Sequence, residues 1–247
     1  ETLIKSYPNE ALLYNISGAC FAGLGQLDTA LKSYEKALAI KPDYAEVHYN
    51  LGVTLQELNQ LDASIKSFEQ AITIKPDYAD AYINLGITLK NLGQLDAAVK
   101  CFEKALAINS NYAEAHNSLG NTLNDLGQLD AAVKCFEKAL AIKPDFAEAH
   151  NNLGNALNDL RQLDAAVKCF KQALAIHPNY AEAHNNLGNT LRDLNQLDAA
   201  VKCFKQALAI HPNYAEAHNN LGNTLRDLNQ LDAAVKCFKQ ALAIHPN

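Results

Sequence analysis

The chain has 247 residues, of which 49% are hydrophobic, so it can bury a sizeable core and is not expected to be intrinsically disordered. Its net charge of −6 argues against a nucleic-acid partner, because a phosphate-binding surface needs clustered Lys and Arg. No apolar run approaches the ~18 residues of a membrane span. No phosphate-binding loop or zinc-type cysteine spacing is present, so we expect no cofactor, no metal and no catalytic residue.

The cysteines indicate the cellular compartment. Five of the six recur every 34 residues, from Cys101 to Cys237, and Cys20 lies outside that series. Equivalent residues of successive helical repeats lie about one helix-packing distance apart, roughly 8–10 Å, which exceeds the ~7 Å limit for a disulfide. We interpret them as small buried apolar residues in a reducing compartment, which predicts a cytoplasmic protein. The chain begins with Glu1 rather than Met, so we expect the natural N-terminus to be missing.

The chain is built from repeats. Residues 162–213 match residues 196–247 letter for letter. Prolines recur on a 34-residue grid, with Ser110 in the one gap, and we number each repeat so that this proline is position 32. The numbering predicts a single solenoid over residues 11–247, preceded by residues 1–10 as the remnant of an earlier helix. Its seven repeats are 11–44, 45–78, 79–112, 113–146, 147–180, 181–214 and 215–247.

Each repeat predicts a first helix, helix A, that runs to about position 14. Its apolar residues recur at helical spacing. Asp or Asn at position 33, as at Asp43, is expected to cap this helix, and an acid three residues later, such as Glu46, resembles half of a capping box. Position 15 is Gly or Asn in six repeats and Arg161 in the fifth, which predicts a residue in the left-handed conformation at the end of helix A.

A second helix, helix B, follows in each repeat and ends before the proline at position 32. In the fifth repeat its apolar face includes Ala166 and Phe170. Gly154 on helix A and Ala166 on helix B are small, so the two helices of the pair are expected to approach closely. One such pair cannot bury both faces, and stacked copies bury each other in a continuous core.

These residues resemble the tetratricopeptide repeat. In the fifth repeat the pattern consists of His150, Leu153-Gly154, Ala166, Phe170 and Pro178, and with the 34-residue period it covers essentially the whole chain. The resemblance implies an all-α, right-handed superhelical solenoid of helix-turn-helix repeats that acts as a scaffold for protein–protein interaction. It also implies that helix A lines the concave groove. His at position 4, where Trp is common in the family, is a departure that we interpret as a packed ring.

The expected groove is rich in asparagine at positions 5, 6 and 9. Asn is a poor residue inside a helix, about 0.5 kcal/mol worse than Ala, so its recurrence favours a role. An amide offers both a donor and an acceptor and can pair with a peptide backbone. This arrangement, which we call the asparagine ladder, is similar to that in the repeat arm of O-linked N-acetylglucosamine transferase. An alternative is that some of these amides bond neighbouring helices, or that they recur only because the repeats were duplicated. The predicted ladder residues are Asn50, Asn84, Asn117, Asn121, Asn151, Asn152, Asn155, Asn185, Asn186, Asn189, Asn219, Asn220 and Asn223.

Charged residues flank the ladder at positions 12 and 13. The expected cations are Lys90, Arg192 and Arg226, and the expected acids are Asp125, Asp159, Asp193 and Asp227. The acids at position 2 are left out because a capping role is available to them. The balance is mildly acidic, which predicts extended, neutral to basic peptide segments as partners.

Two alternatives remain open. The chain is also consistent with a substrate-targeting or oligomerisation arm of a larger enzyme, such as a glycosyltransferase, whose catalytic domain is absent here. It is further consistent with a module that self-assembles end to end, because its last helix B carries Leu231, Val235, Phe238 and Leu242 with no following helix to cover them.

Overall fold

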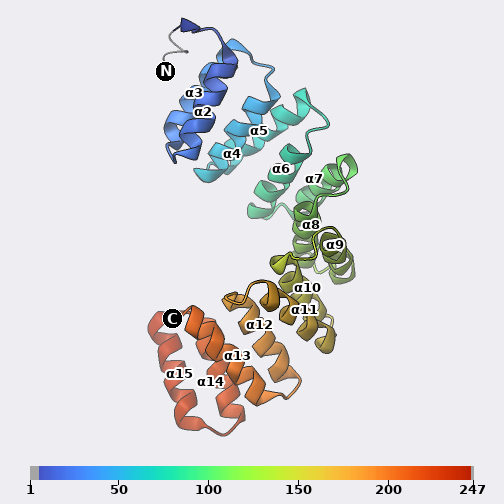
Figure 1. The fold of residues 1–247 in the computed structure, drawn as a ribbon, viewed down its shortest axis with the longest axis vertical. Helices are drawn as coiled ribbons and strands as arrows, with labels where there is room; N and C mark the ends of the chain where they lie inside the picture. Colours follow the sequence, from blue (N-terminus) through green and yellow to red (C-terminus); the bar gives the residue numbers. More distant parts are fainter. Residues whose placement is uncertain (1–5, 246–247) are drawn as a thin grey trace. The chain divides into compact units, whose positions relative to one another are not determined.

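The computed structural model describes residues 6–245, and in that range the chain consists of helices joined by short turns, with no strand. The predicted all-α class is confirmed. Figure 1 shows the helices in chain order. The A helices are α2 (Ala11–Gly23), α4 (Ala45–Glu57), α6 (Ala79–Asn91), α8 (Ala113–Asp125), α10 (Ala147–Asp159), α12 (Ala181–Asp193) and α14 (Ala215–Asp227). The B helices are α3 (Leu27–Ile40), α5 (Leu61–Ile74), α7 (Leu95–Ile108), α9 (Leu129–Ile142), α11 (Leu163–Ile176), α13 (Leu197–Ile210) and α15 (Leu231–Ile244). None of these helices has both the length and the apolarity needed to cross a bilayer.

The end of helix A follows the prediction. Position 15 has a positive φ in every repeat, for example +71° at Gly25, +57° at Asn59 and +62° at Arg161. This left-handed residue reverses the chain direction between the two helices of a pair. Helix B ends two residues before the proline, because a proline interrupts helical hydrogen bonding.

The start of helix A differs from the prediction. After the first repeat, whose helix A follows Glu10, the residue that precedes the helix is the aromatic at position 34, such as Tyr44 or Tyr180. No side chain caps these helices where a cap is described. Asp43 lies one residue too early to act as the cap, and Glu46 makes no capping contact. The prediction assumed that an acid near a helix start must cap it, whereas the turn places position 33 outside the helix.

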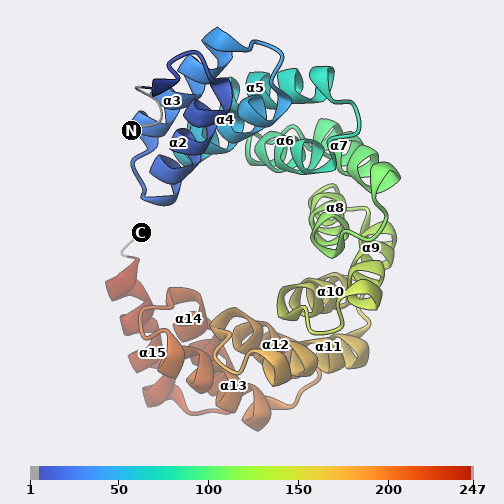
Figure 2. The ribbon, with the colours of Figure 1, turned by 45° about the horizontal axis from the view of Figure 1, so that its top comes forward.

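The chain divides into two compact units, residues 1–122 and 123–247, and the division falls inside α8. Within each unit, the A helices other than α8 pack against their own B helices, and each B helix packs in turn against the next A helix of the same unit. Consecutive A helices also contact each other, whereas the described B helices of one unit do not contact one another. The A helices therefore line the more tightly curved side of each unit. Figure 2 shows α10, α12 and α14 on one side of the second unit and α11, α13 and α15 on the other.

The core of each repeat depends on the predicted close approach of its helices. Phe170 is 1% exposed, and the alanines at positions 20 and 27 of helix B are fully buried in the same repeat. A Cβ atom built on Gly154 would lie 2.6 Å from Phe170 Cε1. Only glycine therefore lets α10 reach the aromatic ring of α11 without displacing it.

The histidines at position 4 have a contact that the sequence analysis did not identify. His184 Nε2 donates to the backbone oxygen of Pro178 at 3.0 Å, and His218 makes the same bond to Pro212 at 2.9 Å. Each ring therefore ties the start of helix A to the turn before it. His116 and His218 are buried, and the other three rings are half-buried.

The cysteines are free but less buried than predicted. The five that follow the repeat are half-buried, and Cys20 is exposed. Burial raises the pKa of the Cys101 thiol to about 11, with a further contribution from Glu69. A thiol with such a pKa is a weak nucleophile at neutral pH, because the thiolate is the reactive form.

Candidate functional site

Asparagines at positions 5 and 6 join neighbouring A helices. Asn151 of α10 is fully buried. Its Oδ1 atom accepts a hydrogen bond from Asn186 Nδ2 at 3.2 Å, and its Nδ2 atom donates to Glu182 Oε1 at 3.3 Å. Both partners lie on α12, so one amide links two repeats. We call the contact of position 5 in one repeat with positions 2 and 6 in the next repeat a repeat junction.

The same junction recurs one repeat later. Asn185 of α12 is also fully buried, accepts from Asn220 Nδ2 at 3.1 Å and donates to Glu216 Oε1 at 3.1 Å. A buried amide whose donor and acceptor are both paired avoids the free-energy cost of an unsatisfied polar group. The alternative in which some amides bond neighbouring helices therefore holds for these residues.

The first unit uses a more varied set of junction contacts. Asn50 Nδ2 donates to Asn15 Oδ1 at 3.0 Å, as in the second unit. Where position 5 is Tyr49, its hydroxyl accepts from Asn84 Nδ2 at 3.1 Å. A tyrosine hydroxyl can therefore replace the amide oxygen as the acceptor at position 5.

Acids at position 2 and tyrosines at position 34 complete the junctions. These acids were expected to cap helix A, whereas Glu182 and Glu216 accept hydrogen bonds from the preceding repeat. The pKa of Tyr214 is raised to about 12. Burial is the largest cause, and the carboxylates of Glu216 and Glu182 raise it further, while a hydrogen bond with Asn185 lowers it. The recurrence of Tyr at position 34 and Glu at position 2 every 34 residues was the available signal.

The asparagines at position 9 behave differently. Asn155, Asn189 and Asn223 lie on the successive helices α10, α12 and α14, and each is half-buried. Within residues 6–245 these amides make no hydrogen bond to the protein, and the same is true of Asn121. The Oδ1 atom of Asn189 is buried without a partner. All four amides are therefore unpaired within the described chain, but the Oδ1 atom of Asn189 is covered by the protein.

The other predicted ladder and charge residues occupy a range of exposures. Asn117 is buried, Asn152 is half-buried and Asn219 is exposed. Among the flanking charges, Lys90 and Arg192 are half-buried. Those that are exposed are Arg226, Asp125, Asp159, Asp193 and Asp227.

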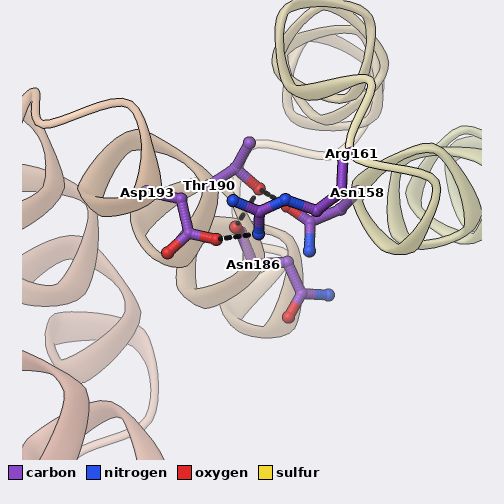
Figure 3. A network of polar contacts seen from close by, with 5 residues as sticks. All are labelled: Asn158, Arg161, Asn186, Thr190 and Asp193. Carbon is purple, nitrogen blue, oxygen red and sulfur yellow. Dashed lines mark hydrogen bonds and ion pairs between the residues drawn. The ribbon is translucent and has the colours of Figure 1, made fainter.

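Arg161 links two repeats through its side chain. Its Nη1 atom lies 3.1 Å from Asp193 Oδ2 in the next repeat, and the two side chains are 70% and 32% exposed. Figure 3 shows this pair beside the hydroxyl of Thr190, which donates either to Asn158 Oδ1 or to the backbone oxygen of Asn186, each at 3.0 Å. Asp193 is therefore paired within the chain, and so is Asp227, whose Oδ1 atom lies 3.8 Å from Arg226 Nη2.

Arg161→Gly is expected to stabilise the second unit. The left-handed conformation of a residue with a side chain costs ~1–2 kcal/mol, whereas an exposed ion pair contributes only ~0–1 kcal/mol. The midpoint of urea unfolding should therefore rise. Asp193→Asn is the matched control, because it removes the ion pair and leaves the strained backbone, so it should leave stability unchanged or slightly lower. A lower midpoint for Arg161→Gly than for Asp193→Asn would contradict this ranking.

The outer face of α15 is apolar and open. Leu231, Val235 and Leu242 are 56%, 51% and 59% exposed. A hollow of about 410 Å³ is lined by Leu242 together with residues that include Phe238 and Asn219. The equivalent face of α13, the B helix of the preceding repeat, is covered because α13 packs against α14.

Family models match almost the whole chain. A model described as "TPR repeat" matches residues 21–59, 55–93, 120–160, 154–191 and 188–225. Two models described as "Tetratricopeptide repeat" match residues 79–112 and 215–247, and residues 101–134.

Individual proteins share parts of this pattern. The peroxisomal targeting signal receptor of Kluyveromyces lactis is 36% identical over 53 residues, which cover 22% of this chain and 9% of the receptor. The crystal structure of MamA is similar with a TM-score of 0.60 and 27% identity, over 66% of this chain and 95% of MamA. YrrB, described as a TPR protein with an unusual peptide-binding site, has the same TM-score and identity over 74% of this chain and 94% of YrrB.

Proposed function

Because the chain belongs to the tetratricopeptide repeat family, we propose that it is a non-enzymatic scaffold for protein–protein interaction that binds extended, neutral to basic peptide segments along its A helices. The observation that carries the proposal is the set of position-9 amides that the chain does not use for itself. The similarity to YrrB, whose description includes a peptide-binding site, supports it. The free cysteines support a cytoplasmic location, where disulfides are rare.

The geometry of the second unit suits an extended partner. Asn155, Asn189 and Asn223 lie on consecutive A helices, and packed helices are separated by roughly 8–10 Å. An extended peptide rises ~3.3 Å per residue, so about every third residue of the partner meets one amide. Asn155 and Asn223 can each donate to a backbone carbonyl and accept from a backbone N–H, whereas Asn189, whose Oδ1 atom is buried, offers its Nδ2 donor. In this proposal the ladder consists of position 9, while positions 5 and 6 hold the repeats together.

Replacing Asn155, Asn189 and Asn223 together by Ala is expected to weaken peptide binding at least about tenfold, if each rung contributes ~0.5–1.5 kcal/mol. Helicity should stay equal or rise, since Ala is the better helix former. The measurement is fluorescence anisotropy with a twelve-residue peptide selected on the wild-type chain from a random display library. Binding that persists unchanged in the triple variant, or a library from which nothing is enriched, would contradict the proposal.

We also propose that the open face of α15 binds another copy end to end, through its exposed leucines and valine. Leu12 and Ile16 of α2 are 48% and 50% exposed and stand at positions 2 and 6, where later repeats carry acid and amide. Sedimentation velocity over a concentration series is expected to show association, and Leu242→Glu should abolish it. A wild-type chain that remains monomeric at millimolar concentration would refute this proposal.

A further inference from the structure

A pocket in the second unit combines an aromatic ring with two carboxylates. It has a volume of about 470 Å³, and its lining includes Tyr214, Glu182, Glu216, His211 and His245. The two glutamates come from successive A helices, and after burial they are the next causes of the raised pKa of the Tyr214 hydroxyl. The face of an aromatic ring attracts a cation because it carries partial negative charge, and carboxylates beside the ring strengthen that attraction.

The two carboxylates carry a charge that no cation of the chain balances. Glu182 and Glu216 are exposed, and their hydrogen-bond donors are the neutral amides of Asn151 and Asn185. Within the described residues neither glutamate forms an ion pair. A cationic side chain that entered the pocket would therefore meet two acids without displacing a partner cation.

Earlier repeats show what the equivalent aromatic ring contacts when a lysine is present. Lysine occupies position 31 in three of them, and its Nζ atom lies over the ring at position 34. The distances to the ring centroid are 4.8 Å for Lys41 over Tyr44, 4.6 Å for Lys75 over Tyr78 and 4.8 Å for Lys143 over Phe146. The chain thus supplies its own cation to these rings.

The later repeats carry histidine at position 31 instead. His211 contacts Tyr214 edge to ring, with centroids 6.3 Å apart. Imidazole is shorter than a lysine side chain and is not a permanent cation at neutral pH. Tyr214 therefore has no lysine at position 31 over its ring. The pocket with the two glutamates lies at this tyrosine.

We propose that this pocket binds one basic side chain, lysine or arginine, of a partner polypeptide. The proposal rests on the proposed peptide-binding function and makes its side-chain preference specific. The partner's ammonium or guanidinium group takes the place over Tyr214 that Lys143 takes over Phe146, with Glu182 and Glu216 on either side. The repeats with lysine at position 31 cannot select in this way because their ring is already occupied.

The test compares two short peptides on the full chain by NMR. The peptides are acetyl-Gly-Ser-Lys-Ser-Gly-amide and the same peptide with norleucine, which keeps the aliphatic stem and removes the charge. Labelled methyl groups of Ala181 and Ala215, which both line the pocket, report binding. We expect the lysine peptide to bind about tenfold more tightly than the norleucine peptide at low salt.

Two variants and one matched control locate the effect. His211→Lys should place an intramolecular lysine over Tyr214. The affinity of the variant for the lysine peptide should then fall to its affinity for the norleucine peptide. The double variant Glu182→Gln with Glu216→Gln keeps the oxygens that accept from the junction amides, removes both charges and should have the same effect. Asn109→Lys changes the same position in the third repeat, in the other unit, and should leave binding as in the wild type.

The pocket proposal would be overturned if the wild-type chain bound the two peptides with equal affinity. It would also be overturned if His211→Lys bound the lysine peptide as tightly as the wild type does. If the display-selected peptide still depends on Asn155, Asn189 and Asn223 in that case, the groove function stands and only the basic preference fails. If neither the short peptides nor the display library bind, the proposed function fails as well.

Discussion

Gly154→Ala is expected to destabilise the second unit by about 1–3 kcal/mol, the range for overpacking in a tight core. The added Cβ atom would lie 2.6 Å from Phe170 Cε1, and the Phe170 ring is 1% exposed, so the clash falls inside the core. This steric cost outweighs the ~1 kcal/mol that Ala normally gains over Gly in a helix. Urea unfolding followed by circular dichroism measures the change.

A matched glycine and a double variant separate the clash from helix propensity. Gly23 is also helical, but a Cβ atom there would meet nothing within 4 Å, so Gly23→Ala should stabilise the chain or leave it unchanged. Phe170→Leu removes the ring atoms that the new methyl group meets. The double variant Gly154→Ala with Phe170→Leu should therefore lose less stability than the two single losses added together. Additive losses would show that the methyl group and the ring do not meet.

Asn185→Ala and Asn189→Ala, one helical turn apart on α12, are expected to change stability in opposite directions. Asn185 is fully buried and hydrogen-bonded to Asn220 and Glu216. Its loss leaves the buried amide of Asn220 without an acceptor, which costs ~1–3 kcal/mol and exceeds the ~0.5 kcal/mol gained in helix propensity. Asn189 makes no hydrogen bond within the described chain, so only the propensity gain remains there.

The two asparagine variants also separate structure from binding. Asn189→Ala should weaken a bound peptide, whereas the peptide affinity of folded Asn185→Ala should change less. Thermal unfolding and peptide anisotropy on the same two proteins provide both measurements. If Asn189→Ala lowers stability as much as Asn185→Ala, position 9 has a structural role like position 5, and the asparagine ladder is not a binding surface.

Much of the fold could be predicted because it depends on local chemistry. The 34-residue period, the left-handed residue at position 15 and the proline after helix B are properties of a few neighbouring residues, and the structure reproduces them. The close contact between Gly154 and Phe170 could also be inferred, because small and large residues recur at complementary positions of the two helices.

The capping prediction was wrong because the contacts of the acids at position 2 are not local. A short acidic side chain near a helix start has a local partner in the backbone N–H groups, so a sequence pattern favours a cap. In the folded chain, Glu182 and Glu216 instead face a buried amide of the preceding repeat. The competing partner lies about 31 residues away in the sequence and becomes a neighbour only when the repeats stack.

By itself the sequence determined that helix pairs form and that their A helices carry recurring asparagines. It did not determine which asparagines remain available to a partner. Asn185 and Asn189 are the same residue type on the same helix, and helix periodicity places them on nearly the same face. Only stacking decides between them, because the next A helix brings Asn220 and Glu216 to Asn185 and no hydrogen-bonding group to Asn189. An amide's role depends on the groups within about 3 Å of it, and in a repeat protein those groups belong to the neighbouring repeat.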